Sequence, residues 1–71
     1  MDRVPVTSSS IASAGYSAEA STLEVEYRNG LVYQYFAVPK SVFESLLEAA
    51  SKGKFVSKHI RGHYPYRRVD G

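Results

Sequence analysis

The most constraining feature of the sequence is the stretch 22–39, in which two runs of alternating apolar and polar residues flank Asn29-Gly30. An Asn-Gly pair between such runs is the strongest short-range signal for a β-hairpin, because both residues tolerate the positive φ angles of a type I′ turn. A two-residue turn fixes the strand register, so we expect Tyr35 to face Glu24 and Tyr33 to face Glu26.

Side chains alternate between the two faces of a strand, so this register also predicts which residues are buried. The face that we expect to pack in the core carries Leu23, Val25, Tyr27, Val32, Phe36 and Val38. The face that we expect to meet solvent carries Glu24, Glu26, Arg28, Leu31, Tyr33 and Tyr35. Two tyrosines on a solvent-facing strand need an explanation beyond folding.

The rest of the chain predicts an α+β fold with a small three-stranded antiparallel meander. We expect residues 8–17 to form the third strand and residues 1–7 to be a loose end. Ser41 and Glu44 have the spacing of a capping box, and the apolar residues that follow recur at helical intervals up to a stop at Gly53. Residues 54–61 predict a second, shorter helix that ends at Gly62 and carries a basic ridge of Lys54, Lys58 and Arg61. Both helices are expected on one face of the sheet.

The size and composition indicate one domain of 71 residues that contains no cysteine. No apolar run is long enough to cross a bilayer, and the first residues lack the blocks of a signal peptide. We therefore expect a cytoplasmic protein without membrane association. The net charge is only +2, but residues 52–68 contain lysines and arginines and no acidic residue.

The order and spacing of several short motifs resemble the KTSC domain, a short bacterial module also found at the C-terminus of some lysyl-tRNA synthetases. The resemblance covers most of the chain and rests on Ser8-Ser9-Ser10, Gly15-Tyr16, Leu23-Glu24-Val25, Asn29-Gly30, Tyr33-Gln34-Tyr35, Val38-Pro39, Ala50-Ser51-Lys52-Gly53, Ile60-Arg61 and Tyr64. The link to a tRNA synthetase implies RNA binding. The family has no agreed catalytic residues, so the resemblance provides none to assign to this chain.

The residues favour a non-catalytic module that binds nucleic acid, with RNA as the expected ligand and no cofactor. Lysine and arginine neutralise phosphates, and tyrosines stack on bases. The candidate binding residues are Tyr33, Tyr35, Lys54, Lys58, Arg61, Tyr64, Arg67 and Arg68. Tyr66 also interleaves with the arginines. Two alternatives stay open: the central tyrosines are half-buried under the N-terminal strand or under an expected C-terminal tail of residues 63–68, and the basic segment 52–68 is only solvated surface.

Two further functions are compatible with the same residues. A protein-interaction or self-association module would use exposed tyrosine and arginine at its interface. A small ribonuclease would use His59 and His63 with Tyr64, Arg61 and Arg67 as acid–base and phosphate-binding groups. The two histidines are four residues apart, but without cysteine they make a poor metal site, and we expect His59 to pack at the edge of the core.

Overall fold

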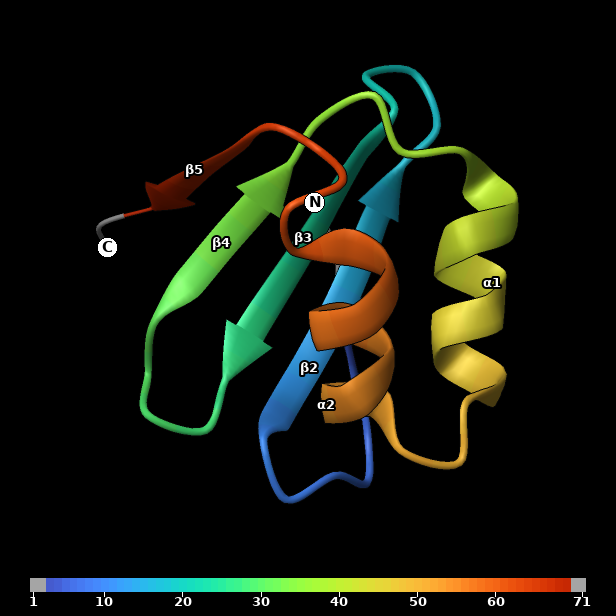
Figure 1. Ribbon diagram of the computed structural model, residues 1–71. Coiled ribbons are helices and arrows are strands. Elements are labelled where there is room, and N and C mark those ends of the chain that lie inside the picture. The colour runs from blue at the N-terminus through green and yellow to red at the C-terminus, as the bar shows by residue number, and fades with distance from the viewer. Residues whose placement is uncertain (1–2, 70–71) are drawn as a thin grey trace.

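The computed structural model describes residues 3–69, which form a five-stranded antiparallel sheet with its helices on one face (Figure 1). The strands follow the order of the sequence across the sheet: β1 (Arg3–Pro5), β2 (Ile11–Ser17), β3 (Thr22–Tyr27), β4 (Val32–Tyr35) and β5 (Tyr66–Val69). The helical segments lie between β4 and β5: α1 (Lys40–Glu48), α2 (Lys52–Phe55) and η1 (Val56–Ile60). The architecture is therefore α+β.

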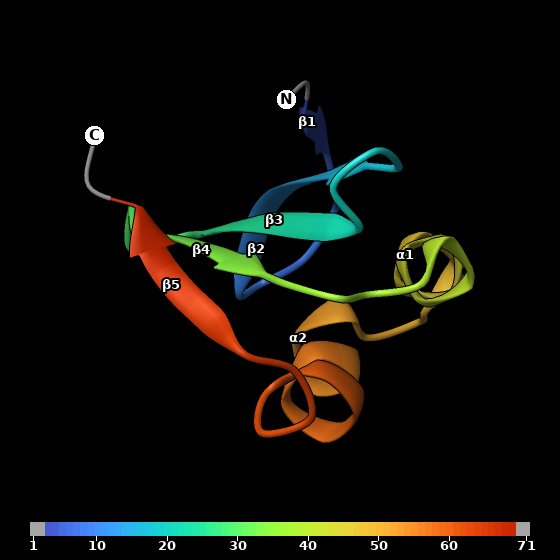
Figure 2. The ribbon, with the colours of Figure 1, turned by 90° about the horizontal axis from the view of Figure 1, so that it is seen from above.

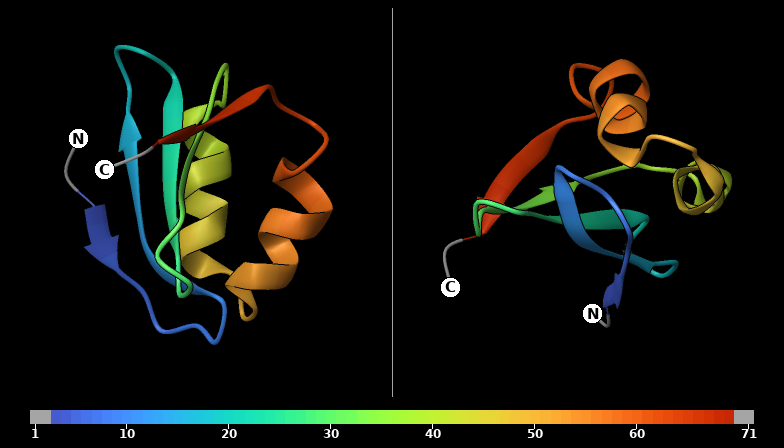
Figure 3. Two further views of the ribbon diagram at one scale, coloured as in Figure 1. Left: turned by 90° about the vertical axis from the view of Figure 1, so that its left-hand side faces the viewer. Right: turned by 90° about the horizontal axis from the view of Figure 1, so that it is seen from below.

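The helices lie on one side of the sheet, and α2 covers its centre (Figures 2 and 3). The segment η1 is a π-helical turn that continues α2 without a break. Helix α1 lies beside α2 and contacts β2 (Figure 3). Among residues 3–69, no helix combines the length and apolar character that a membrane span requires.

The expected three-stranded meander was wrong, because each end of the chain adds an edge strand. Residues 3–5 of the expected loose end pair with β2 and form β1, whereas residues 6 and 7 are not in a strand; positions 1 and 2 lie outside the described residues. Pro5 is compatible with β1 because an edge strand has one side without ladder partners. The expected tail forms β5, and the Phe36 amide donates to the Pro65 carbonyl at 2.9 Å at the start of that pairing.

The hairpin is correctly located, but its turn is longer than expected. The Gly30 amide donates to the Tyr27 carbonyl at 2.9 Å, and the Tyr27 amide donates to the Leu31 carbonyl at 2.8 Å. Gly30 has φ of +90°, whereas Asn29 does not have a positive φ. This is a type I turn followed by a left-handed residue, which makes a three-residue connection in place of the two-residue type I′ turn.

The longer turn shifts the register by one residue and reverses the faces of β4. Leu23 faces Tyr35 and Val25 faces Tyr33, whereas Glu24 faces Gln34. A shift of one residue exchanges every side chain between the two faces. The prediction that Tyr33 and Tyr35 face solvent beside two glutamates was therefore wrong, since both lie on the helix-covered face.

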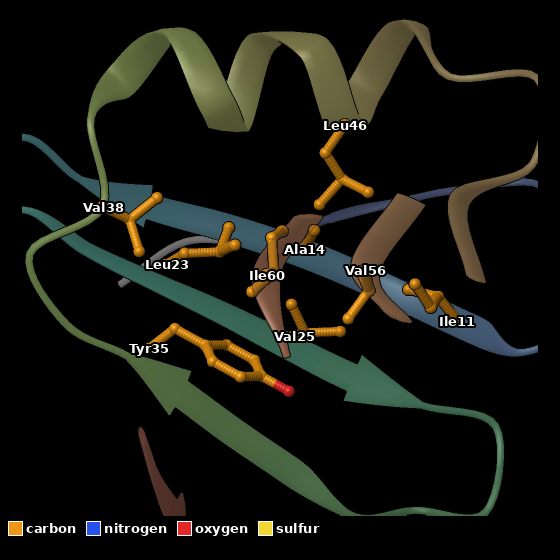
Figure 4. Close-up of a cluster of buried hydrophobic side chains, with 9 residues drawn as sticks. All are labelled: Ile11, Ala14, Leu23, Val25, Tyr35, Val38, Leu46, Val56 and Ile60. Atoms are coloured by element: carbon orange, nitrogen blue, oxygen red, sulfur yellow. The ribbon is translucent and has the colours of Figure 1, made fainter. Parts of the chain in front are cut away.

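The core fills the space between that face and the helices (Figure 4). Tyr35 is 2% exposed and therefore lies in the core. Val32 and Phe36, which we expected in the core, are only half-buried. The buried apolar residues are Ile11, Ala14, Leu23, Val25, Tyr35, Val38, Leu46, Val56 and Ile60. They come from β2, β3, β4, the segment after β4, α1 and η1, so the core depends on contacts between distant parts of the chain.

The helices also begin and end differently from the prediction. Helix α1 begins at Lys40 after Pro39, which makes no side-chain cap, so the expected capping box does not form. Gly53 does not stop a helix but lies within α2. A β-carbon at this position would lie 2.9 Å from Ser10 Oγ, so glycine allows the helix to approach the loop before β2. Gly62, with φ of +81°, follows the end of η1 as expected.

Candidate nucleic-acid interface

A pocket lined mainly by tyrosines lies between the hairpin, β5 and the end of η1. It has a volume of about 730 Å³ and is lined by Tyr27, Asn29, Leu31, Tyr33, Tyr35, Ser57, Arg61, Gly62 and Tyr66. We call it the tyrosine pocket. The register positions its aromatic residues, because Tyr33 and Tyr35 on β4 share one face of the sheet with Tyr66 on β5.

Two hydroxyl groups form a hydrogen-bonded pair in this pocket. Tyr27 Oη and Tyr35 Oη are 2.8 Å apart, and either can be the donor. Burial raises the pKa of the Tyr35 phenol strongly, and its hydrogen bond to Tyr27 adds to the rise. Burial also raises the pKa of Tyr27, partly offset by its hydrogen bond to Tyr35 and by the Arg61 guanidinium. Both phenols are therefore neutral at physiological pH and can donate or accept hydrogen bonds.

Aromatic rings contact one another around the pair. The Tyr33 ring meets the rings of Tyr27 and Tyr66 edge-on, with centroid separations of 5.5 and 5.6 Å. The Tyr66 ring lies 5.9 Å from that of Tyr35 and is itself 63% exposed. The cluster therefore has a packed interior and one ring surface open to solvent.

Arg61 places a positive charge beside these phenols. It follows η1 directly, and its amide donates to the Val56 carbonyl at 2.8 Å, in the wider hydrogen-bonded ring of a π-helical turn. Arg68 faces Tyr33 across the β4–β5 ladder and therefore shares the face of the sheet that carries the tyrosines. The register shift brings tyrosines and cations together, whereas the predicted faces would have separated them.

The two lysines among the candidate residues lie nearby but outside the tyrosine pocket. Lys54 and Lys58 are exposed on α2 and η1 and line a second, shallower hollow. Ser57 lines both that hollow and the tyrosine pocket. Tyr64, also a candidate, packs against the core. The predicted basic ridge therefore divides, with Arg61 in one depression and the lysines in the next.

Arg67 lies on the opposite face of the sheet. Its Nη2 donates to Gln34 Oε1 at 3.2 Å, and Gln34 Nε2 donates to Glu24 Oε1 at 2.9 Å. Arg3 forms an ion pair with the same carboxylate at 3.3 Å. This chain of polar contacts links residues of β1, β3, β4 and β5. It lies on the face of the sheet opposite the tyrosine pocket, so Arg67 does not reach that pocket.

The histidines do not join the pocket. Both His59 and His63 are exposed, and the His59 ring lies 4.9 Å from that of Phe55. His59 is exposed and lies beside Phe55, which packs against the core. Within residues 3–69, no three side chains of metal-binding type come together.

The candidate binding residues left out two of the four tyrosines that line the pocket, Tyr27 and Tyr66. We assigned Tyr27 to the core because it alternates with Leu23 and Val25. This placed Tyr27 on the correct face of β3. Tyr66 was predicted to supply stacking beside the arginines but was not among the candidate binding residues. Its role in the pocket depends on the pairing of β5 with β4, for which the local sequence gives no signal.

The fold and the pocket define a class: a small α+β domain whose sheet presents a tyrosine- and arginine-lined pocket at one end of the helical layer. The KTSC domain model matches residues 7–64, and the chain belongs to that family. The crystal structure of a KTSC domain protein from Yersinia pestis is similar, with a TM-score of 0.92 and 37% identity over 97% of both chains.

Two curated relatives differ in length. A protein of Stutzerimonas stutzeri (strain A1501) is 45% identical and matches 99% of this chain and 100% of its own length. A lysine–tRNA ligase of Nostoc punctiforme (strain ATCC 29133 / PCC 73102) is 41% identical over 54 residues, which cover 76% of this chain but 10% of the ligase. The predicted family resemblance is thus confirmed.

Proposed function

We propose that this domain is a non-catalytic module that binds single-stranded nucleic acid, with RNA as its ligand, through the tyrosine pocket. One observation supports this proposal most strongly: four tyrosines and Arg61 line the same solvent-accessible pocket. Aromatic faces stack on bases, and guanidinium groups contact phosphates.

The geometry of the pocket supports a base as the occupant. The exposed ring of Tyr66 offers a stacking surface, and the Tyr27–Tyr35 hydroxyl pair offers both donor and acceptor capacity for the edge of a base. Arg61 lies beside the phenols, where it can contact an adjoining phosphate. Tyr33 would contribute to the wall of the pocket, and the buried Tyr35 would contribute through its hydroxyl.

The choice of RNA rests on the relatives. A lysine–tRNA ligase contains a segment similar to this chain, and its name identifies tRNA as what it acts on. The segment is a tenth of that ligase, so we propose only an accessory contact with RNA and no part of the ligation reaction.

The placement of the acid–base residues favours binding over ribonuclease activity. Neither His59 nor His63 lines the tyrosine pocket, and the neutral phenols there are poor bases at physiological pH. A metal-free cleavage assay on labelled RNA tests this directly. Turnover that is lost in His63→Ala would contradict the non-catalytic proposal.

The test of binding is an NMR titration with a short mixed-sequence single-stranded RNA at low and physiological salt. We expect the amide resonances of Tyr33, Arg61 and Tyr66 to shift, and the affinity to fall with salt by a logarithmic slope of about 0.7 for each neutralised phosphate. Arg61→Gln should lower the affinity and reduce the slope by about 0.7.

Arg67→Gln is the matched control, because it removes the same charge from the opposite face of the sheet. It should leave the titration almost unchanged. No shifts at low salt, or equal losses for the two variants, would contradict binding at the tyrosine pocket.

A second function, self-association or binding of a protein partner, is favoured by β5. This strand is at the edge of the sheet, and an open edge can pair with another chain. We propose pairing with a second copy as the rival use of this edge. Sedimentation velocity across a range of concentrations tests it, and concentration-dependent association without RNA binding would favour it over the first proposal.

A further inference from the structure

A second hollow lies between the loop that precedes β2 and the helical layer, next to the tyrosine pocket. It has a volume of about 540 Å³, and its polar lining includes Ser9, Ser10, Ser57, Lys54 and Lys58. We call it the serine hollow. Figure 1 shows the loop before β2 close to the start of α2, and Gly53 allows this approach because the Ser10 side chain occupies the space of a β-carbon.

The loop is held in place by bonds that leave the serine hydroxyls on its surface unused. Ser8 Oγ accepts hydrogen bonds from the amides of Ser10 and Ile11, both at 3.2 Å. The Arg28 amide donates to the Ser10 carbonyl at 2.9 Å, and its Nε donates to the Ser8 carbonyl at 3.1 Å. Within residues 3–69, the hydroxyls of Ser9 and Ser10 make no hydrogen bond, so they remain available as donors on a fixed loop.

The charge of the hollow is positive. Lys54 on α2 and Lys58 on η1 both line the hollow. Neither ammonium group forms an ion pair with the described residues, and no carboxylate is among the residues that line the hollow. Ammonium and hydroxyl donors around one depression suit an anion with several acceptor oxygens, such as a phosphate group.

Ser57 connects this hollow to the tyrosine pocket. It lies between Lys54 and Lys58 along the helix and lines both depressions. Lys54 lies on α2, Ser57 and Lys58 lie on η1, and Arg61 follows η1 directly, so one short segment of the chain borders both depressions. A single strand could therefore pass from one depression to the other without wrapping an edge of the sheet.

We propose that the serine hollow binds the phosphodiester group next to the nucleotide in the tyrosine pocket. This inference rests on the proposed function of that pocket and adds a requirement to it. The ligand must be longer than one nucleoside, with its phosphate held by Lys54, Lys58 and the serine hydroxyls. Binding should therefore improve sharply when a second nucleotide is added.

The test compares adenosine, the dinucleotide ApA and the tetranucleotide of adenosine in NMR titrations at low salt. The amides of Tyr33 and Tyr66 report on the tyrosine pocket, and those of Ser9 and Ser10 report on the serine hollow. We expect adenosine to shift only the first pair and the longer ligands to shift both. Lys58→Gln should weaken tetranucleotide binding about fivefold or more and leave adenosine binding unchanged.

Lys40→Gln is the matched control, because it removes an exposed lysine charge at the start of α1, away from the hollow. It should change the tetranucleotide affinity less than twofold. Tetranucleotide shifts confined to Tyr33 and Tyr66, or equal effects of the two lysine variants, would overturn the inference while the proposed function stands.

A separate outcome addresses the proposed function. If the oligonucleotides shift neither pair of amides, the proposed function fails, and the inference of a phosphodiester site fails with it. Inorganic phosphate then serves as the remaining probe, because shifts of Ser9 and Ser10 that are reduced in Lys58→Gln would identify the hollow as a site for a free anion.

Discussion

Replacing Tyr66 by alanine should affect binding more than folding, because the side chain is largely exposed. The side chain is 63% exposed on an edge strand, and its ring contacts the rings of Tyr33 and Tyr35. Cross-strand pairs of this kind contribute about 0.2–1 kcal/mol each. We therefore expect the free energy of unfolding to fall by about 1 kcal/mol, which leaves the domain folded.

The loss in binding should be larger than the loss in stability. Stacking of a base on an aromatic side chain contributes about 1–3 kcal/mol. Tyr66 is open to solvent on much of its surface, so we take the lower part of that range, about 1–2 kcal/mol, which corresponds to a 5- to 30-fold weaker affinity. Fluorescence anisotropy with a short labelled RNA at low salt measures this change, and urea unfolding measures stability in parallel.

Val4→Ala is the control, because Val4 is also an exposed apolar residue, 47% exposed, on the opposite edge strand β1. We expect its RNA affinity to stay within twofold of the parent chain. An unchanged affinity for Tyr66→Ala, measured on a folded variant, would refute stacking on Tyr66.

Three further predictions concern the elements that position the pocket. Gly30→Ala should lower the free energy of unfolding by about 1–2 kcal/mol in urea denaturation, because φ of +90° is unfavourable for alanine although the added methyl group meets no atom; no loss would contradict the observed turn. Gly53→Ala should lower it by about 1–3 kcal/mol, because the new β-carbon would meet Ser10, and wild-type stability would contradict that close approach. The raised pKa of Tyr35 means that the folded state keeps this proton at a pH where the unfolded chain loses it, so stability should be full below pH 10 and fall as pH rises further. The decline in unfolding free energy with pH should be shallower in Tyr35→Phe, and an equally steep decline in that variant would assign it to other groups.

Several parts of the fold follow from local sequence patterns. The alternation in residues 22–27 correctly placed Leu23 and Val25 in the core, and the helical spacing after Pro39 correctly predicted a helix there. These patterns are informative because periods of two and of about three and a half residues each distinguish one face of an element from the other. The α+β class and the family were predictable for the same reason: each depends on local patterns in a fixed order.

The edge strands could not be predicted in this way. Neither 3–5 nor 66–69 shows a strong pattern of alternation, and each contains or follows a proline. They are strands because β2 and β4 offer open edges beside them, which is a property of the assembled sheet. The pairing of β5 with β4 in turn places Tyr66 beside Tyr33.

The sequence by itself determined that a hairpin forms around Asn29-Gly30 and that a helix with a basic side follows the sheet. Only the tertiary structure decided which face of β4 is buried, because the choice between a two-residue and a three-residue turn changes the register by one residue. Local turn preferences allow both connections. The structure has the three-residue turn, in which Tyr35 enters the core under the helices and its hydroxyl meets that of Tyr27, and that choice created the tyrosine pocket.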